Sequence, residues 1–275
     1  MKKIDRFKQY MKQHESLLRC PICQKGIKVT DDNVVCEQNH AFDIAKKGYI
    51  NFMTKPVNTK YDKELFEARH HIIASGMYEP LHKKIRTLID EKYETANIID
   101  LGCGEGTHLA YIVNEVEAEV TKSGMDIAKE GVMTAAKNHL DMLWCVGDLA
   151  QSPFQSSTFD VALNILSPAN YDEFKRLLTD DGMVIKVVPR AGYLKELREA
   201  FYDQEDYTNE QTVDRFKENM NQVETYHLSY TFSLSKDLVP SLHKMTPLTW
   251  NVARDVALDL SEVSIDLDIL IGKTS

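Results

Sequence analysis

Three of the chain's five cysteines lie within a stretch of 21 residues that ends on a histidine. Cys20, Cys23, Cys36 and His40 follow the spacing C-x₂-C-x₁₂-C-x₃-H. Each close pair fits on one tight turn, and the interval between the pairs is long enough for a β-hairpin. Four such ligands fill the tetrahedral sphere of Zn²⁺ and leave no position for a catalytic water. The spacing therefore predicts a structural zinc site, whose metal supplies folding energy to a small unit, rather than three free thiols and an incidental histidine.

A second group of residues that could bind a ligand begins at Asp100. Here Asp100, Gly102, Gly104, Glu105 and Gly106 follow an apolar run and precede a helical pattern. Glycines let a ligand approach the backbone, and doubly wound folds bind ligands beyond the carboxyl ends of their strands. The spacing G-x-G-x-G differs from the G-x-G-x-x-G of dinucleotide sites. The acidic residue before the loop suits a ligand that carries an ammonium group better than one that carries phosphates.

Two more acidic residues end the next two predicted strands. Asp126 in "GMDIAK" is placed to accept hydrogen bonds from ribose hydroxyls, and Asp148 in "VGDLAQ" could face the exocyclic amine of an adenine. With Asp100 they match the ammonium, ribose and adenine of S-adenosylmethionine. Asp126 or Asp148 taken alone could instead be a helix N-cap. The series of three favours a cofactor site.

The elements that must position these residues alternate along the chain. Short apolar runs at 97–102, 120–127, 142–148, 159–166 and 183–189 alternate with helical patterns, the last of which is expected over 171–182. This order predicts βαβ units and a parallel, doubly wound sheet. Two late strands, at 224–234 and 261–272, resemble the closing hairpin of Rossmann-like methyltransferases. The predicted fold is α/β, a Rossmann-like class I methyltransferase sheet with a small zinc-ribbon-type domain before it.

Three segments are expected. Residues 1–55 form a basic zinc-binding module for RNA recognition, 56–95 a helical linker, and 96–275 the methyltransferase domain. Residues 1–60 hold twelve Lys/Arg and six Asp/Glu, whereas the remainder holds 21 and 36. Phosphate would be attracted to residues 1–60, which carry a net positive charge, and repelled by the acidic remainder of the chain. No apolar run is long enough to cross a bilayer, and no signal peptide is recognisable. Cysteines in a metal spacing indicate a reducing compartment, so a cytoplasmic protein is expected.

The combination of both motifs resembles the 23S rRNA (guanine-N1)-methyltransferase family, the RlmA-like enzymes, over nearly the whole chain from Cys20. The stretches that carry the resemblance are "CPIC…VVCEQNHAFDIAKKGYINFM", "ASGMYEPL", "IIDLGCGEG", "GMDIAK", "PFQSSTFDVAL" and "MTPLTW". The resemblance implies methyl transfer from S-adenosylmethionine to N1 of a guanine in a hairpin of 23S rRNA. It also implies a homodimer.

Site residues carried over by position follow from the same resemblance. The zinc ligands fall on the Cys/His cluster already described. Cofactor contacts fall on Tyr78, Gly104, Glu105 and Tyr193; at the last position the family pattern has histidine. The stretch "ARHH" before "ASGMY" departs from the arginine pair of the family. His70 and His71 are expected to be exposed helix residues without a role rather than RNA contacts.

Guanine N1 is protonated, so the enzyme must flip the base out and help its proton leave. The loop that follows the fourth parallel strand lies beside the methyl group in this fold class. Ser167, Pro168 and Asn170 are the candidates there for contacts to the base, through backbone carbonyls or the amide; no general base is assigned. Two alternatives remain: a small-molecule methyltransferase in which zinc is a stability clip, and a non-catalytic RNA-binding module.

Overall fold

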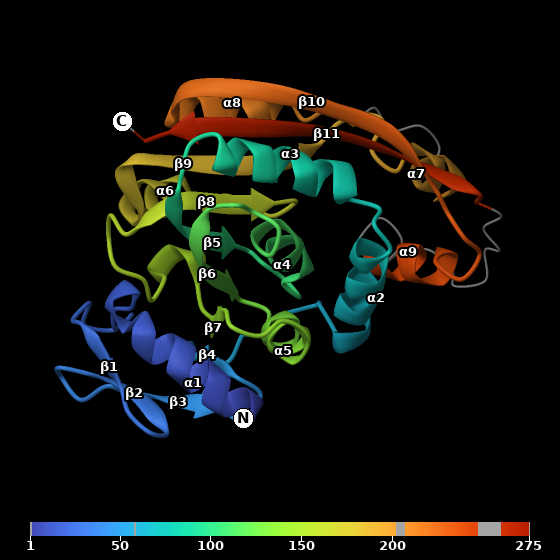
Figure 1. Cartoon of the computed structure of the whole chain (residues 1–275). Helices are drawn as coiled ribbons and strands as arrows, with labels where there is room; N and C mark the ends of the chain where they lie inside the picture. Colours follow the sequence, from blue (N-terminus) through green and yellow to red (C-terminus); the bar gives the residue numbers. More distant parts are fainter. Residues whose placement is uncertain (1, 58, 202–206, 247–259, 275) are drawn as a thin grey trace.

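The computed structural model describes residues 2–57, 59–201, 207–246 and 260–274. In these residues one sheet of eleven strands runs through the molecule, in the order β1-β2-β3-β4-β7-β6-β5-β8-β9-β11-β10 (Figure 1). The strands are β1 (Ile27–Val29), β2 (Asn33–Cys36), β3 (Ala41–Ala45), β4 (Tyr49–Asn51), β5 (Thr95–Leu101), β6 (Glu119–Asp126), β7 (Leu143–Val146), β8 (Phe159–Ile165), β9 (Leu178–Pro189), β10 (Asn221–Ser233) and β11 (Glu262–Lys273).

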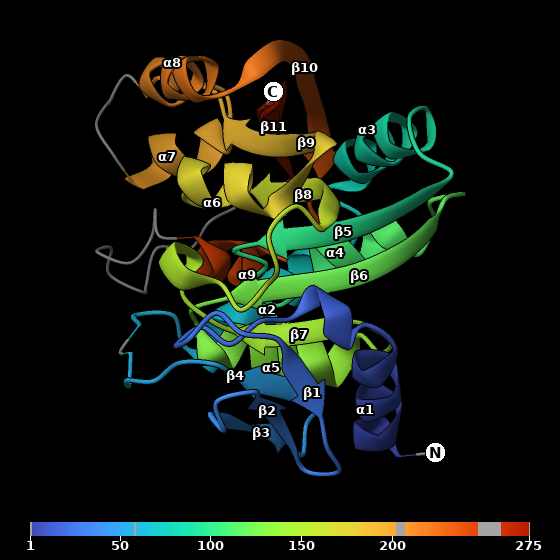
Figure 2. The ribbon, with the colours of Figure 1, turned by 90° about the vertical axis from the view of Figure 1, so that its left-hand side faces the viewer.

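Helices cover both faces of this sheet; Figure 2 shows α3 on one face and α6, α7 and α8 on the other. The helices are α1 (Lys3–Gln13), α2 (Lys63–Ala74), α3 (Glu79–Asp90), α4 (Thr107–Val113), α5 (Lys129–Asn138), α6 (Tyr171–Leu177), α7 (Lys195–Phe201), α8 (Glu210–Asn219) and α9 (Val239–Met245), with 3₁₀ turns η1 (Glu15–Leu17) and η2 (Leu149–Gln151). Pro80 lies in the first turn of α3, where its missing N–H costs no hydrogen bond.

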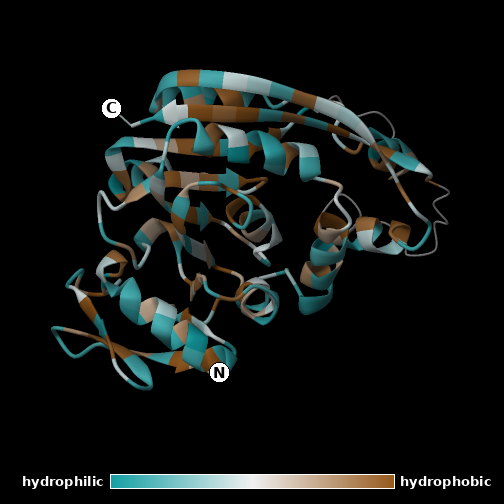
Figure 3. Ribbon diagram, in the orientation of Figure 1, coloured by the Kyte–Doolittle hydropathy of each residue, from teal (hydrophilic) through white to brown (hydrophobic). Residues whose placement is uncertain are grey.

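The five central strands are parallel, which confirms the doubly wound prediction. Strand β5 pairs with β6 and β8, β6 with β7, and β8 with β9, all in parallel. The two late strands form the antiparallel end of the sheet, with β11 between β9 and β10. Figure 3 shows polar residues interspersed with apolar ones along β10, as expected for an edge strand with one solvated face.

One predicted boundary is wrong. The helical pattern was expected to continue to Gly182, but α6 ends at Leu177 and β9 begins at Leu178. Leu178 is buried and already pairs with Phe159 of β8. Sheet pairing and burial therefore override the local helical preference of residues 178–182.

The N-terminal segment extends the central sheet through hydrogen-bonded strand pairing and is not a separate domain on a linker. Strand β4 pairs in parallel with β7, through Ile50 opposite Cys145 and Asn51 opposite Val146. One large buried core extends from Phe7 to Leu270, beside a small second cluster of Leu65, Phe66 and Ala128. The zinc-ribbon strands thus continue the central sheet, while 56–95 supplies α2 and α3, two helices with buried apolar faces.

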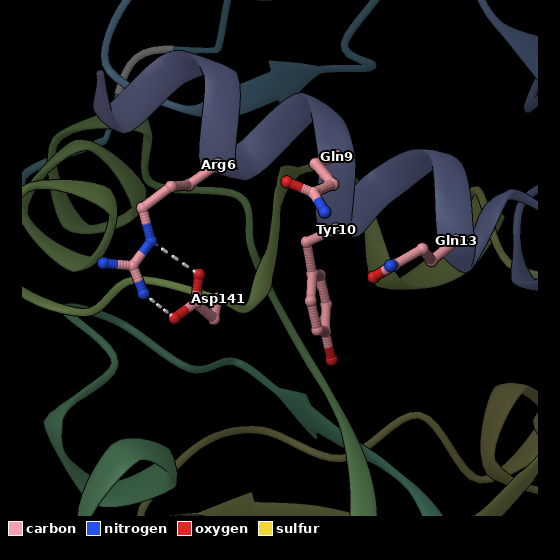
Figure 4. Close-up of a pocket in the computed structure, with 5 residues that line it drawn as sticks. All are labelled: Arg6, Gln9, Tyr10, Gln13 and Asp141. Atoms are coloured by element: carbon pink, nitrogen blue, oxygen red, sulfur yellow. Dashed lines mark hydrogen bonds and ion pairs between the residues drawn. The ribbon is translucent and has the colours of Figure 1, made fainter. Parts of the chain in front are cut away.

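Helix α1, which the charge-rich N-terminus did not lead us to predict, braces this junction. Arg6 forms a bidentate ion pair with Asp141 in the loop before β7 (Figure 4). The Tyr10 hydroxyl accepts a hydrogen bond of 2.7 Å from the backbone N–H of Lys122, in the first half of β6. With Gln9 and Gln13 these side chains line an open pocket. It adjoins the amino-terminal part of the parallel strands, so it lies away from the glycine loop at their carboxyl ends.

Candidate metal centre and cofactor site

The four predicted metal ligands lie together in the structure. The ligand atoms of Cys20, Cys23, Cys36 and His40 are all within 4.8 Å of one another. Cys20 Sγ and Cys36 Sγ are each 3.5 Å from His40 Nδ1, and Cys23 Sγ is 3.5 Å from Cys36 Sγ. Zn–S bonds of about 2.3 Å in a tetrahedron place ligand atoms somewhat under 4 Å apart. The cluster therefore fits one structural zinc ion.

The two turns that present these ligands have the geometry of zinc knuckles. Gln24 and Asn39 both adopt left-handed backbone conformations, with φ of 62°. Their N–H groups close the turns on the carbonyls of Cys20 and Cys36, at 2.8 Å each. Burial by itself raises the pKa of the Cys36 thiol, but hydrogen bonds from the backbone N–H groups of Gln38 and His40 and from the neighbouring thiols outweigh it and lower the pKa to about 7. Donors around the sulfur thus favour the thiolate that a metal requires.

The glycine loop connects β5 to α4 in a conformation that side chains would block. Gly102 and Gly106 have φ of 88° and 75°. A Cβ on Gly102 would lie 2.0 Å from Ser167 Oγ, and one on Gly106 would lie 2.4 Å from the Trp144 ring. The loop therefore packs directly against the loop after β8 on one side and against β7 on the other.

Asp100, the last residue but one of β5, has a buried and partly unpaired carboxylate. The residue is 1% exposed, and its Oδ1 has no hydrogen-bond partner among the described residues. Burial and the nearby carboxylates of Asp126 and Glu105 raise its pKa well above the usual range. Buried polar atoms are normally paired, so an orphan here indicates a missing donor. The ammonium group of S-adenosylmethionine supplies such a donor.

Asp126 holds the glycine loop to the end of β6. Its Oδ2 accepts a hydrogen bond of 2.8 Å from Gly104 N, and its Oδ1 accepts one of 2.7 Å from Ala128 N. Burial raises the pKa of this carboxyl. It is not the N-cap of α5, because that position belongs to Ala128. Each carboxylate oxygen keeps a second lone pair, so Asp126 remains compatible with a ribose.

Asp148 is the N-cap of a 3₁₀ turn, which agrees with the alternative that it is a helix N-cap. Its carboxylate accepts a hydrogen bond of 2.9 Å from Ala150 N at the start of η2, and the residue is exposed. This is a sufficient local reason for an acidic residue here. A contact to adenine stays a prediction.

Glu105 turns its side chain away from the loop into a polar cluster that the sequence did not reveal. Its carboxylate accepts hydrogen bonds from the backbone N–H and the hydroxyl of Thr107. His70 Nδ1 lies 2.8 Å, and His139 Nε2 3.2 Å, from the same hydroxyl. Burial raises the pKa of Glu105 to about 7 and lowers that of His139 to about 4. The expectation that His70 is exposed is wrong, because its contact with Thr107 packs α2 onto the start of α4 and leaves the residue half-buried.

Tyr78 and Tyr193 meet although 115 residues separate them. Tyr78 is buried at the N-cap of α3, and Tyr193 lies in the turn after β9. Their hydroxyls are 2.5 Å apart. The tyrosine at the position where the family pattern has histidine therefore keeps a hydrogen bond to Tyr78.

The loop after β8 is held from behind by two residues that sequence reasoning missed. Lys186 Nζ donates hydrogen bonds to Asn164 Oδ1 (2.6 Å) and to the carbonyl of Ser167 (2.8 Å). Asn164 Nδ2 donates to the carbonyls of Leu101 (2.7 Å) and Pro168 (3.1 Å). Both candidate carbonyls thus already accept one bond within the protein.

The Asn170 amide has a structural task. Its Oδ1 accepts a hydrogen bond of 3.1 Å from Glu173 N and so caps α6. Its Nδ2 approaches the carbonyl of Leu149 at 3.4 Å. Of the candidates for base contact, Ser167 is the one whose side chain adjoins the cofactor loop.

Comparison with known proteins gives the family. Residues 18–63 match the model "RlmA, N-terminal", a zinc ribbon, and residues 98–182 match the model "Methyltransferase domain". The chain is 41% identical over 273 residues to the Bacillus subtilis protein named "Putative 23S rRNA (guanine-N(1)-)-methyltransferase YxjB", covering 94% of this chain and 97% of that protein. It is 27% identical to the "23S rRNA (guanine(748)-N(1))-methyltransferase" of Streptomyces fradiae, over 85% of this chain and 86% of that one. The chain therefore belongs to the RlmA-type family of 23S rRNA (guanine-N1)-methyltransferases.

Proposed function

We propose that this protein transfers the methyl group of S-adenosylmethionine to N1 of a guanine in a hairpin of 23S rRNA. The single observation that carries the proposal is the fusion of a complete zinc ribbon to a methyltransferase sheet through the β4–β7 pairing, in the family whose relatives bear that name. The orphaned carboxylate of Asp100 supports the same cofactor.

When bound, S-adenosylmethionine supplies an electrophilic methyl group. The protein's residues bind and orient it: Asp100 receives the ammonium, Asp126 holds the glycine loop and accepts from the ribose, and Tyr78 and Tyr193 form one wall. The Ser167 side chain packs on Gly102, and the Ser167–Pro168 backbone is placed to face the acceptor base. Positioning of this kind accounts for a large part of catalysis in group transfer.

The distribution of charge supports an RNA substrate over a small molecule. Residues 1–60 carry twelve basic and six acidic side chains, while the rest of the chain is acidic. A zinc that serves as a stability clip needs no such surplus of positive charge. We infer that the zinc ribbon binds the phosphate backbone of the hairpin and delivers the base to the acidic catalytic part.

Two further inferences concern assembly and place. We propose a homodimer, as the family resemblance implies, and a cytoplasmic location, which suits zinc-ligating thiols that must stay reduced. Within the described residues no helix is long and apolar enough to span a membrane. One chain has a mass of 31.5 kDa, and light scattering at micromolar concentration should give twice that mass. A measured mass equal to that of one chain would contradict the homodimer.

The decisive experiment is tritiated methyl transfer to unmodified 23S rRNA, with mapping of the modified base. A methyl group on guanine N1 blocks Watson–Crick pairing, so reverse transcription should stop at one guanine in a hairpin. RNA in which that guanine is replaced by adenine is the matched control. Label in small molecules only would favour the small-molecule enzyme, and failure to bind S-adenosylmethionine would favour the non-catalytic RNA-binding module.

A further inference from the structure

Lys186 is a buried cation in the middle of β9, directly beside the proposed acceptor loop. It is 3% exposed and lies opposite Asn164 of β8 in the parallel register. On its other side the register partner is Leu270 of β11, which is apolar and buried. Its ammonium reaches forward to Asn164 and to the Ser167 carbonyl, at 2.6 and 2.8 Å.

Lys186 differs from the other buried cation among the described residues in having no counter-ion. Arg86, which is 9% exposed, forms ion pairs with Glu79 and Glu115. No carboxylate lies within 4.0 Å of the Lys186 ammonium in the described part of the chain; this includes Asp100 of β5, the strand on the far side of β8. Burial alone lowers the pKa of Lys186, to about 8, so the side chain is largely charged at neutral pH. A buried charge without a counter-ion is costly, and buried ionisable groups with shifted pKa values cluster at functional sites.

Asn164 connects this charge to both halves of the site. It is fully buried, and its amide bridges the last residue of β5, Leu101, to Pro168 in the acceptor loop. Leu101 directly precedes Gly102, which packs on Ser167. The Lys186–Asn164 pair therefore sets the distance between the cofactor loop and the loop that receives the base.

The positive charge of Lys186 is suited to a methyl acceptor that must lose a proton. Guanine N1 must give its proton to water or hydroxide before its lone pair forms the N–CH₃ bond. The methyl–sulfur bond then breaks and the sulfur keeps the electron pair, so the sulfonium becomes a neutral thioether. A guanine that has lost its N1 proton is an anion, with charge shared by N1 and O6. A positive charge held behind the loop favours that anion in a site surrounded by low-dielectric core.

We propose that Lys186 is a positioning residue for the methyl acceptor, which acts through Asn164 and the Ser167 carbonyl to fix the acceptor loop and whose positive charge favours the N1-deprotonated guanine. This inference rests on the proposed function, because it assumes that the accepting atom is a ring nitrogen that must lose a proton.

The test compares Lys186→Gln, which removes the charge, with Lys186→Arg, which keeps it, and with Lys217→Gln as a control on the exposed face of α8. Single-turnover methyl transfer to the rRNA hairpin is measured from pH 6 to 9.5, together with thermal unfolding and the affinity for S-adenosylhomocysteine. We expect K186Q to be slower by about tenfold or more at pH 7 and to regain rate as pH rises, because hydroxide then removes the N1 proton without help from the positive charge. K186R should follow the wild-type pH profile below about pH 8, where Lys186 is charged, and K217Q should match the wild type.

The outcomes are distinguishable. Wild-type protein without transfer to rRNA would overturn the proposed function and this inference with it. Active wild type with a K186Q profile of unchanged shape, whether at full rate or reduced equally at every pH, would overturn this inference alone. If K186Q does not fold, K186R decides: a rate that follows the wild type below about pH 8 supports the role of the charge, and a profile displaced in that range refutes it.

Discussion

The hydroxyl groups of Tyr78 and Tyr193 form a hydrogen bond across the proposed cofactor site, with 2.5 Å between the oxygens. Tyr78 is 2% exposed, so its hydroxyl cannot turn to bulk water if the partner is removed. A neighbouring tyrosine, Tyr230, donates to the carbonyl of Met77 at 2.7 Å and fixes the turn before α3. The pair thus ties the start of α3 to the segment after β9.

Removing one hydroxyl of this pair should cost more than removing both. Tyr193→Phe leaves the buried Tyr78 hydroxyl unpaired, which typically costs about 1–3 kcal/mol of unfolding free energy. The double variant Tyr78→Phe/Tyr193→Phe removes both polar groups and should lose less than the sum of the single losses. Tyr193→His, which restores the family pattern, should lose less than Tyr193→Phe. Urea unfolding of the wild type, Tyr78→Phe, Tyr193→Phe, the double variant and Tyr193→His checks this, and strictly additive losses would contradict it.

The zinc site should be required for the stability of the whole sheet edge. Because β4 pairs with β7, loss of the metal should loosen one side of the central sheet as well as the knuckles. Cys36→Ala is expected to abolish stoichiometric zinc and to lower the melting temperature by several degrees or more. Cys145→Ala, which removes a buried thiol of β7 outside the cluster, should keep one zinc per chain. Elemental analysis and thermal unfolding measure both; full zinc content in Cys36→Ala would exclude Cys36 as a ligand.

The sequence predicted the parallel strands and the zinc ligands because both leave strong local patterns. Buried strands appear as apolar runs, and metal ligands need fixed spacings. It did not predict that the ribbon continues the central sheet, because the pairing of β4 with β7 joins residues about a hundred positions apart. Strand pairing at this separation leaves no local signal.

Within the site, the residues missed are those whose partners are distant in sequence. Lys186 reads as an interruption of an apolar strand, and only the register opposite Asn164 shows that its ammonium is used. Thr107, His70 and His139 come from α4, α2 and the end of α5. The one signal available in the sequence was a lysine inside an otherwise apolar predicted strand.

Glu105 should make the folded state less stable as pH rises. Its folded pKa of about 7 lies above the usual 4.5, so the folded state binds the extra proton. Its contribution is therefore fully present below about pH 4.5 and is lost as pH approaches 7, by about 3 kcal/mol at most. His139, with a pKa lowered to about 4, acts in the opposite sense between about pH 4 and 6.5. The two effects partly cancel in the wild type.

Glu105→Gln isolates the carboxyl from the histidine. Its amide oxygen can still accept from Thr107, so the contacts of the cluster are largely retained. The difference in unfolding free energy between this variant and the wild type should grow in favour of the variant from pH 5 to pH 7. Denaturant unfolding at three pH values measures it. A difference that is constant with pH would mean that Glu105 titrates normally in the folded protein.

The basic front should control RNA affinity without affecting the cofactor. Lys25, Lys28, Lys46 and Lys47 are all exposed, in or beside the turns of the zinc ribbon. If each contacts one phosphate, changing all four to glutamine should reduce the slope of log affinity against log salt by about 3.

The matched control changes four exposed lysines of the acidic part, namely Lys129, Lys175, Lys217 and Lys236. Both quadruple variants lose the same formal charge, so a difference between them reports location rather than net charge. Fluorescence anisotropy with the rRNA hairpin at several salt concentrations gives the slopes, and calorimetry with S-adenosylhomocysteine gives cofactor affinity, which should stay unchanged in both. Equal slopes in the two variants would show that long-range charge, and not the zinc-ribbon surface, attracts the RNA.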